Sequence, residues 1–146
     1  MTAMQHVKIR FPLEIGEDGY PPESVETLWA FDIGEGRYKI DNIPFYAKLI
    51  SDGDIVSASS RDSGLEFEKL LVASPNCTFR VIMLDGTNGI DEREHLKMMG
   101  CVTEGSGTEG FFAVSVDKAK YQDIASYLAN AHDDGKLDFE ESSIRG

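Results

Sequence analysis

The feature that most constrains the fold is a series of short segments with alternating apolar residues, separated by turns rich in glycine and aspartate. The first segment, residues 7–13, has Val7, Ile9 and Phe11 on one side of the chain. A period of two predicts a strand with one buried face. Comparable segments follow at 25–33, 37–41, 46–50, 55–60 and 65–73. Five or six short strands at this spacing predict a small, strongly bent sheet or barrel.

The stretch DNIPF joins two of these segments and combines a polar pair with an apolar one. Asp41 and Asn42 have side chains that readily accept hydrogen bonds from turn amides. Pro44 restricts Ile43 to extended geometry, and we expect Phe45 to fill the interior of the bent sheet. The stretch is therefore interpreted as a structural corner of the fold and not as a catalytic loop.

The pattern changes at Pro75-Asn76. From there the chain predicts a strand at 78–84, a helix at 90–100, two strands around the turn GTEG and a helix at 118–135, with Asp117 as its cap and Gly135 at its end. A last strand follows at 137–142. This β-α-β-β-α-β order is typical of a ferredoxin-like unit, with a four-stranded antiparallel sheet and two helices on one face.

The predicted fold class is therefore α+β. A small antiparallel β subdomain, residues 1–75, is expected to pack on a ferredoxin-like α+β subdomain, residues 76–146. That packing would bury the face of the second sheet that its helices leave open.

The charge balance limits the classes of partner. The chain has 26 acidic and 14 basic residues and a net charge of −12. Such a field repels nucleic acid and anionic membranes and favours cationic partners. No apolar run approaches the roughly 18–20 residues that span a bilayer. The N-terminal sequence lacks the long apolar region of a signal peptide, so we expect a cytoplasmic protein.

Residues that could carry chemistry are scattered in the sequence. Cys77 and Cys101 are predicted to be buried free thiols, because neither is part of a metal-binding spacing. No cofactor, metal or enzymatic activity is predicted. An enzyme would need a deep pocket that collects two or more of these side chains: Glu26, Asp41, Asn42, His95 and Asp85.

The single tryptophan, Trp29, lies within an alternating segment, where Leu28 and Ala30 point to the opposite side. Two interpretations stay open: a tryptophan in the core, or one on a binding face.

Residues 20–56 contain a distinctive set of positions: Pro21-Pro22, Glu26–Ala30, Gly36, Tyr38, Ile40–Phe45, Ala47 and Gly53-Asp54. With these residues the segment resembles the bacterial domain of unknown function (DUF) family 4265. Tyr46 stands where the family pattern has a second phenylalanine, a conservative difference. The resemblance extends over about residues 7–142 and implies a bacterial, cytoplasmic, compact protein, without implying any catalytic residue.

A small, acidic chain without an assembled active site predicts a protein-binding module, most concretely an immunity or antitoxin-type protein. Such a protein neutralises a cognate toxin by covering a basic surface with carboxylates. The expected contact residues lie in loops 14–18, 52–54 and 104–109 and in the tail 133–141, together with Trp29. They are Glu17, Asp18, Trp29, Asp52, Asp54, Glu104, Glu109, Asp133 and Asp134. The alternative is a small-molecule-sensing regulatory module that uses the ferredoxin-like half as its effector domain. The sequence leaves the oligomeric state open.

Overall fold

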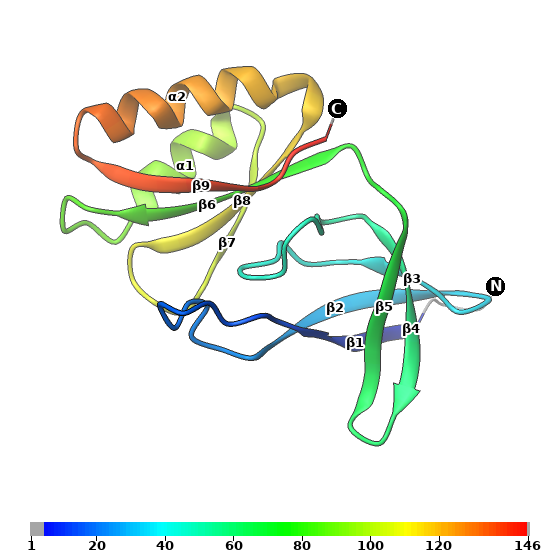
Figure 1. Cartoon of the computed structure of the whole chain (residues 1–146). Coiled ribbons are helices and arrows are strands. Elements are labelled where there is room, and N and C mark those ends of the chain that lie inside the picture. The colour runs from blue at the N-terminus through cyan, green and yellow to red at the C-terminus, as the bar shows by residue number, and fades with distance from the viewer. Residues whose placement is uncertain (1–4, 146) are drawn as a thin grey trace. The chain divides into compact units, whose positions relative to one another are not determined.

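The computed structural model describes residues 5–145, and its internal packing divides the chain into two units, residues 1–74 and 75–146. Each unit has a hydrophobic core of its own. The chain has a mixed α+β fold: the first unit is a closed barrel of five strands, and the second is a four-stranded sheet with two helices (Figure 1).

The barrel strands follow one another around the barrel in chain order. They are β1 (Gln5–Pro12), β2 (Val25–Gly34), β3 (Arg37–Ile40), β4 (Ile55–Arg61) and β5 (Gly64–Val72). Consecutive strands are antiparallel, so the first and fifth of five run in the same direction. The barrel therefore closes through a parallel pair, in which Ile9 lies opposite Leu65 and Arg10 opposite Glu66.

Residues 46–50, one of the segments predicted to be a strand, form turns instead. The whole connection between β3 and β4, residues 41–54, is a loop. The strand prediction from alternating residues was wrong here. Ala47 and Ile50 belong to a loop, and their apolar side chains are nevertheless buried in the barrel core.

The barrel core is built from inward-facing residues of the strands. Its buried members are Ile9, Phe11, Leu28, Ala30, Ile40, Ala47, Ile50 and Val56. Phe45 was expected to fill this interior, yet it is half-buried and lies outside the core cluster. Trp29 points away from the core with 39% of its surface exposed, which excludes the core interpretation of this residue.

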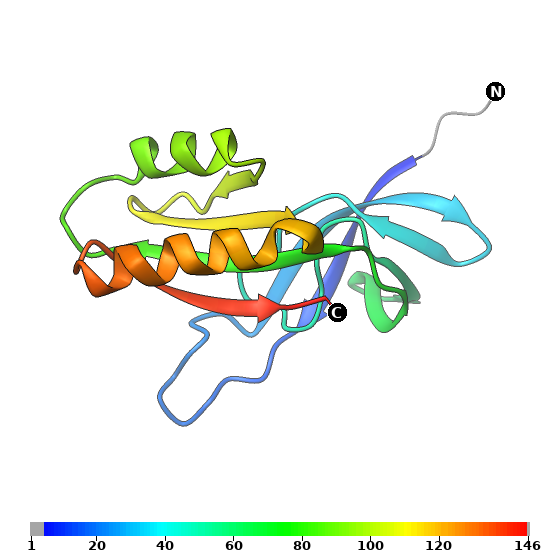
Figure 2. The ribbon, with the colours of Figure 1, turned by 90° about the horizontal axis from the view of Figure 1, so that it is seen from above.

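The second unit has the predicted element order. Its elements are β6 (Asn76–Met83), α1 (Ile90–Met98), β7 (Val102–Gly105), β8 (Phe111–Asp117), the 3-10 turn η1 (Lys118–Lys120), α2 (Tyr121–Asp133) and β9 (Leu137–Ser143). The strand order in the sheet is β7-β8-β6-β9, and each neighbouring pair is antiparallel. Both helices cover the same face of this sheet (Figures 1 and 2).

The helical face of the sheet carries the second core. Phe79 and Val81 of β6 pack with Leu96 of α1 and with Ile124 and Leu128 of α2. The two cysteines are buried and free, as expected. Within residues 5–145 neither helix combines the length and apolar content that crossing a bilayer requires.

Candidate functional site

The corner that follows β3 is tied to Trp29 of β2 by two hydrogen bonds. The amide of Asp41 donates to the carbonyl of Trp29 at 2.9 Å. The amide of Trp29 donates in turn to Asn42 Oδ1 at 2.6 Å. Pro44, two residues on, is buried. Asp41 takes part in these contacts through its backbone and Asn42 through its side chain. Of the two side chains, that of Asn42 therefore fixes the corner to β2.

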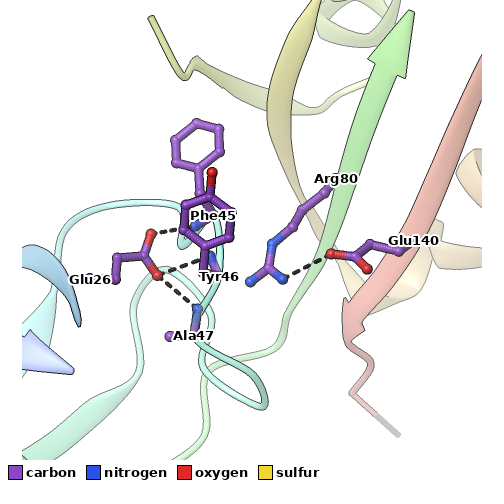
Figure 3. Close-up of polar contacts among 6 residues, drawn as sticks. All are labelled: Glu26, Phe45, Tyr46, Ala47, Arg80 and Glu140. Carbon is purple, nitrogen blue, oxygen red and sulfur yellow. Dashed lines mark hydrogen bonds and ion pairs between the residues drawn. The ribbon is translucent and has the colours of Figure 1, made fainter. Parts of the chain in front are cut away.

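Glu26 of β2 holds the next part of the same loop. Its carboxylate accepts three backbone hydrogen bonds, from Phe45 at 2.6 Å, Tyr46 at 3.0 Å and Ala47 at 2.7 Å (Figure 3). Three successive amides converging on one carboxylate form an anion-binding nest that a side chain of the chain itself fills. Because these bonds are charge-assisted, they fix the loop backbone more firmly than neutral hydrogen bonds would.

A pocket of about 270 Å³ opens beside this loop. Its apolar lining comes from the end of β1, from β5 and from both long loops of the barrel: Phe11, Pro12, Leu13, Pro21, Tyr46, Ala47, Ile50 and Phe67. Glu14 and Lys48 supply its two charged side chains. The pocket is mostly apolar with few polar groups, which is the composition typical of small-molecule sites.

The pocket lies beside the parallel seam of the barrel, which is short. β1 and β5 pair at only two positions, Ile9 with Leu65 and Arg10 with Glu66. Immediately beyond the seam, the rings of Phe11 and Phe67 stack with their centroids 4.6 Å apart.

The outer face of the barrel carries an aromatic and basic cluster around Trp29. The ring of His6 stacks on Trp29 at 4.4 Å and on Phe31 at 4.8 Å, and Lys8 Nζ lies 4.9 Å from the centroid of Trp29. His6 Nε2 lies 3.1 Å from Asp41 Oδ2. The side chain of Asp41 thus reaches this exposed face, in contrast to that of Asn42.

The acids expected to contact a partner from the first unit differ in exposure. Glu17 is exposed, and Asp18 is exposed while its carboxylate accepts a hydrogen bond from the amide of Tyr20. Asp52 is half-buried. Asp54 is fully buried and accepts hydrogen bonds from the amides of Ser51 and Ser74. Its carboxylate therefore has a structural role and cannot belong to an exposed contact surface.

In the second unit the exposed acids concentrate where α2 ends and β9 begins. Asp133 and Asp134 are exposed at the end of the helix, and Asp138, Glu140 and Glu141 are exposed along β9. The other two expected contact residues of this unit are Glu104, which is half-buried, and Glu109, which is exposed.

All three of the β9 acids are engaged within the unit. Asp138 Oδ1 lies 3.7 Å from His132 Nε2 and accepts a hydrogen bond of 2.9 Å from the amide of Phe139. Glu140 forms an ion pair of 3.0 Å with the buried Arg80 of β6 (Figure 3). Glu141 accepts a hydrogen bond of 2.6 Å from the hydroxyl of Tyr121, and this bond is the main cause that raises the pKa of that tyrosine. These carboxylates therefore already stabilise the sheet and its helix.

A polar contact also links the two helices α1 and α2. The hydroxyl of Tyr127 donates to Glu92 Oε2 at 2.6 Å, and the ring of His95 stacks on Tyr127 at 4.8 Å. Burial, followed by the hydrogen bond to Glu92, raises the pKa of Tyr127 far above its usual value. Burial also raises the pKa of the Cys101 thiol to about 11.

The five side chains considered for catalysis are divided between the units. Glu26, Asp41 and Asn42 hold the loop and the outer face of the barrel. In the second unit, His95 stacks on Tyr127, and Asp85 accepts hydrogen bonds from the hydroxyl and the amide of Thr87, which lower its pKa. Each of these side chains has a local structural contact.

A family model for a domain of unknown function (DUF4265) matches residues 26–139. The chain belongs to this family. The match confirms the resemblance found in residues 20–56. A solved structure of similar fold is the crystal structure of a hypothetical protein from Neisseria gonorrhoeae, with 21% identity, 99% of each chain covered and a TM-score of 0.81. At this identity the similarity shows the fold alone. No curated protein matches the chain.

Sequence reasoning missed two parts of the site. Glu26 was considered only for catalysis, although a carboxylate on a strand can also accept hydrogen bonds from the amides of a neighbouring loop. Lys48 was not considered, and Glu14 was considered only within the acidic loop 14–18, because the two residues are 34 positions apart and no spacing rule joins them. The one available signal was the family pattern itself, which includes Glu26 together with the loop residues that it binds.

Proposed function

We propose that the protein is a cytoplasmic protein-binding module of the immunity or antitoxin type, which binds a basic segment of a cognate toxin along β9. The observation that carries the proposal is the position of β9 as a terminal strand of its sheet, with exposed acids along it and at the helix end before it.

A terminal strand offers backbone groups to a partner. In the described part of the chain no strand pairs with the outer edge of β9. Edge strands are natural templates for an added strand, whose main-chain hydrogen bonds supply affinity while side chains supply specificity. The acids near β9 would select a segment rich in lysine and arginine.

The acids at the end of α2 are unfavourable for the helix itself. Asp133 is its last residue and Asp134 its C-terminal cap. The partial negative charge of a helix C-terminus repels anionic side chains, at a cost of about 0.3–1 kcal/mol each. Apart from the 3.7 Å contact between Asp133 Oδ1 and His132 Nδ1, two adjacent acids at this position work against local stability, which supports a role in binding.

Charge-reversal variants test whether binding depends on the acids near β9 or only on the net negative charge of the protein. The variant Asp133→Lys/Asp134→Lys/Asp138→Lys changes the net charge by +6, because each substitution replaces −1 with +1. The matched control, Glu23→Lys/Glu35→Lys/Asp62→Lys, makes the same change at exposed positions of the first unit.

The experiment is co-expression with the products of neighbouring genes, followed by co-purification and growth rescue. We expect one of these products to be a toxin that the wild type and the control variant bind and neutralise, and that the β9 variant fails to neutralise. Failure of every neighbouring product to bind, or equal loss in both variants, would overturn the proposal.

We further interpret the second unit as ferredoxin-like, which the strand order β7-β8-β6-β9 supports. This order favours the alternative function, a small-molecule-sensing effector domain that acts as a dimer. The alternative requires a dimer in sedimentation experiments and a thermal shift with a metabolite, and a strict monomer without such a shift removes it.

A further inference from the structure

We propose that the pocket beside the parallel seam of the barrel binds a free aromatic α-amino acid, with the ring among the apolar side chains and the ammonium and carboxylate groups between Glu14 and Lys48. This site lies in the first unit and does not depend on partner binding at β9.

The lining of the pocket fits a flat apolar group. Phe11 and Phe67 are stacked on one another, and Tyr46, whose ring meets that of Tyr20 edge-on at 5.9 Å, also lines the pocket. Aromatic rings favour such offset and edge-on neighbours. At about 270 Å³ the pocket is slightly smaller than the roughly 300–1,000 Å³ of sites for drug-sized molecules. A metabolite with one ring system is therefore a better fit than a nucleotide.

The two charged residues define the polar end of the ligand. Glu14 and Lys48 line the same pocket, yet within residues 5–145 neither forms an ion pair, with the other or with a third residue. One anionic and one cationic side chain that face a common space without pairing complement a zwitterionic ligand. The ammonium of the ligand would meet the carboxylate of Glu14, and its carboxylate would meet the ammonium of Lys48.

The pocket wall is held in place in advance. Tyr46 and Ala47 belong to the wall, and both donate their backbone amides to Glu26 (Figure 3). Leu13 also lines the pocket, and its amide donates to the carbonyl of Ser24 at 2.8 Å, which fixes the start of the other loop. A preformed wall spares the ligand the entropic cost of ordering it.

The probe is L-phenylalanine, added to ¹⁵N-labelled protein and followed by two-dimensional NMR. We expect saturable shifts of the backbone amides of Phe11, Leu13, Glu14, residues 46–48 and Phe67. N-acetyl-L-phenylalaninamide, which has the same ring without either charge, is expected to bind at least tenfold more weakly. L-leucine, which keeps both charges without the ring, is expected to be weaker as well.

Substitutions identify the charged partners. Lys48→Gln and Glu14→Gln are each expected to weaken L-phenylalanine binding by about tenfold, because each removes one charge-assisted contact. Lys39→Gln and Glu23→Gln, at exposed positions outside the pocket, are expected to leave L-phenylalanine binding unchanged. The NMR spectra also show whether each variant is folded.

Three outcomes would overturn the proposal. The first is the absence of saturable shifts at the pocket with L-phenylalanine at about 10 mM. The second is equal binding of the uncharged N-acetyl amide. The third is an unchanged affinity for L-phenylalanine in both Lys48→Gln and Glu14→Gln. Equal binding of the N-acetyl amide would indicate an aromatic residue within a polypeptide in place of a free amino acid.

Discussion

The backbone amide of Ala47 lies 2.7 Å from Glu26 Oε1, while the side chain of Ala47 belongs to the barrel core. One residue thus joins a strand carboxylate, the hydrophobic core and the wall of the pocket. Loss of this contact should affect stability and ligand binding together.

The first prediction concerns Glu26. Glu26→Ala leaves three half-buried amides without their charged acceptor, and we expect a loss of about 2–3 kcal/mol in the free energy of unfolding. Urea unfolding measures it. Glu23→Ala, at an exposed position of the preceding loop, should change stability by less than about 0.5 kcal/mol. Because formate can occupy the empty nest, formate should restore more stability to Glu26→Ala than to the wild type. Equal responses would contradict the nest.

The second prediction separates two neighbours in the corner. Asn42→Ala removes the acceptor of the Trp29 amide and should cost about 1–2 kcal/mol. Asp41→Ala removes only an exposed pair with His6 and should cost less than about 1 kcal/mol. Thermal or urea unfolding distinguishes the two. A larger loss in Asp41→Ala would show that the corner depends on the aspartate side chain.

The third prediction uses the unfavourable acids at the end of α2. Asp133→Lys and Asp134→Lys should each raise stability by about 0.3–1 kcal/mol, since a cation there complements the helix dipole. The same substitutions should weaken binding of a basic partner. Opposite signs for stability and binding are the diagnostic result. A variant that loses stability would indicate that the acids support the fold.

The fourth prediction concerns pH. Burial raises the pKa of Cys101 from 9.0 to about 11, so the folded state keeps a proton that the unfolded state loses. This contribution to stability is complete below pH 9 and is lost as the pH rises from 9 to 11. The free energy of unfolding of the wild type should therefore fall more steeply in this window than that of Cys101→Ala. Parallel pH profiles would contradict it.

The fifth prediction concerns backbone strain at Leu49. This exposed leucine has a φ of +66°, in the left-handed region that disfavours a β-carbon. Leu49→Gly should relieve the strain and raise the free energy of unfolding by about 0.5–1 kcal/mol after the entropy of glycine is counted. Lys48→Gly, a neighbour outside the positive-φ positions, should lower it. A destabilised Leu49→Gly would mean that the leucine side chain contributes contacts.

Local pattern predicted most elements of the chain. The strands β2 and β3, the element order after Pro75 and the helix α2 each follow from periodicity and turn residues within a short window. The prediction of a strand at 46–50 was wrong because it also rested on local pattern alone. The apolar residues of this segment face the core from a loop whose shape depends on Glu26, about 20 residues earlier.

The sequence alone determined the family, the mixed α+β class, and the burial of both cysteines. Only the tertiary structure decided that the barrel closes through β1 and β5, that Trp29 faces outward and that Asp54 is buried. It also brought Glu14 and Lys48 to one pocket. The physical reason is range: periodicity records which side of an element is apolar, whereas barrel closure and pocket formation depend on contacts between residues distant in the chain.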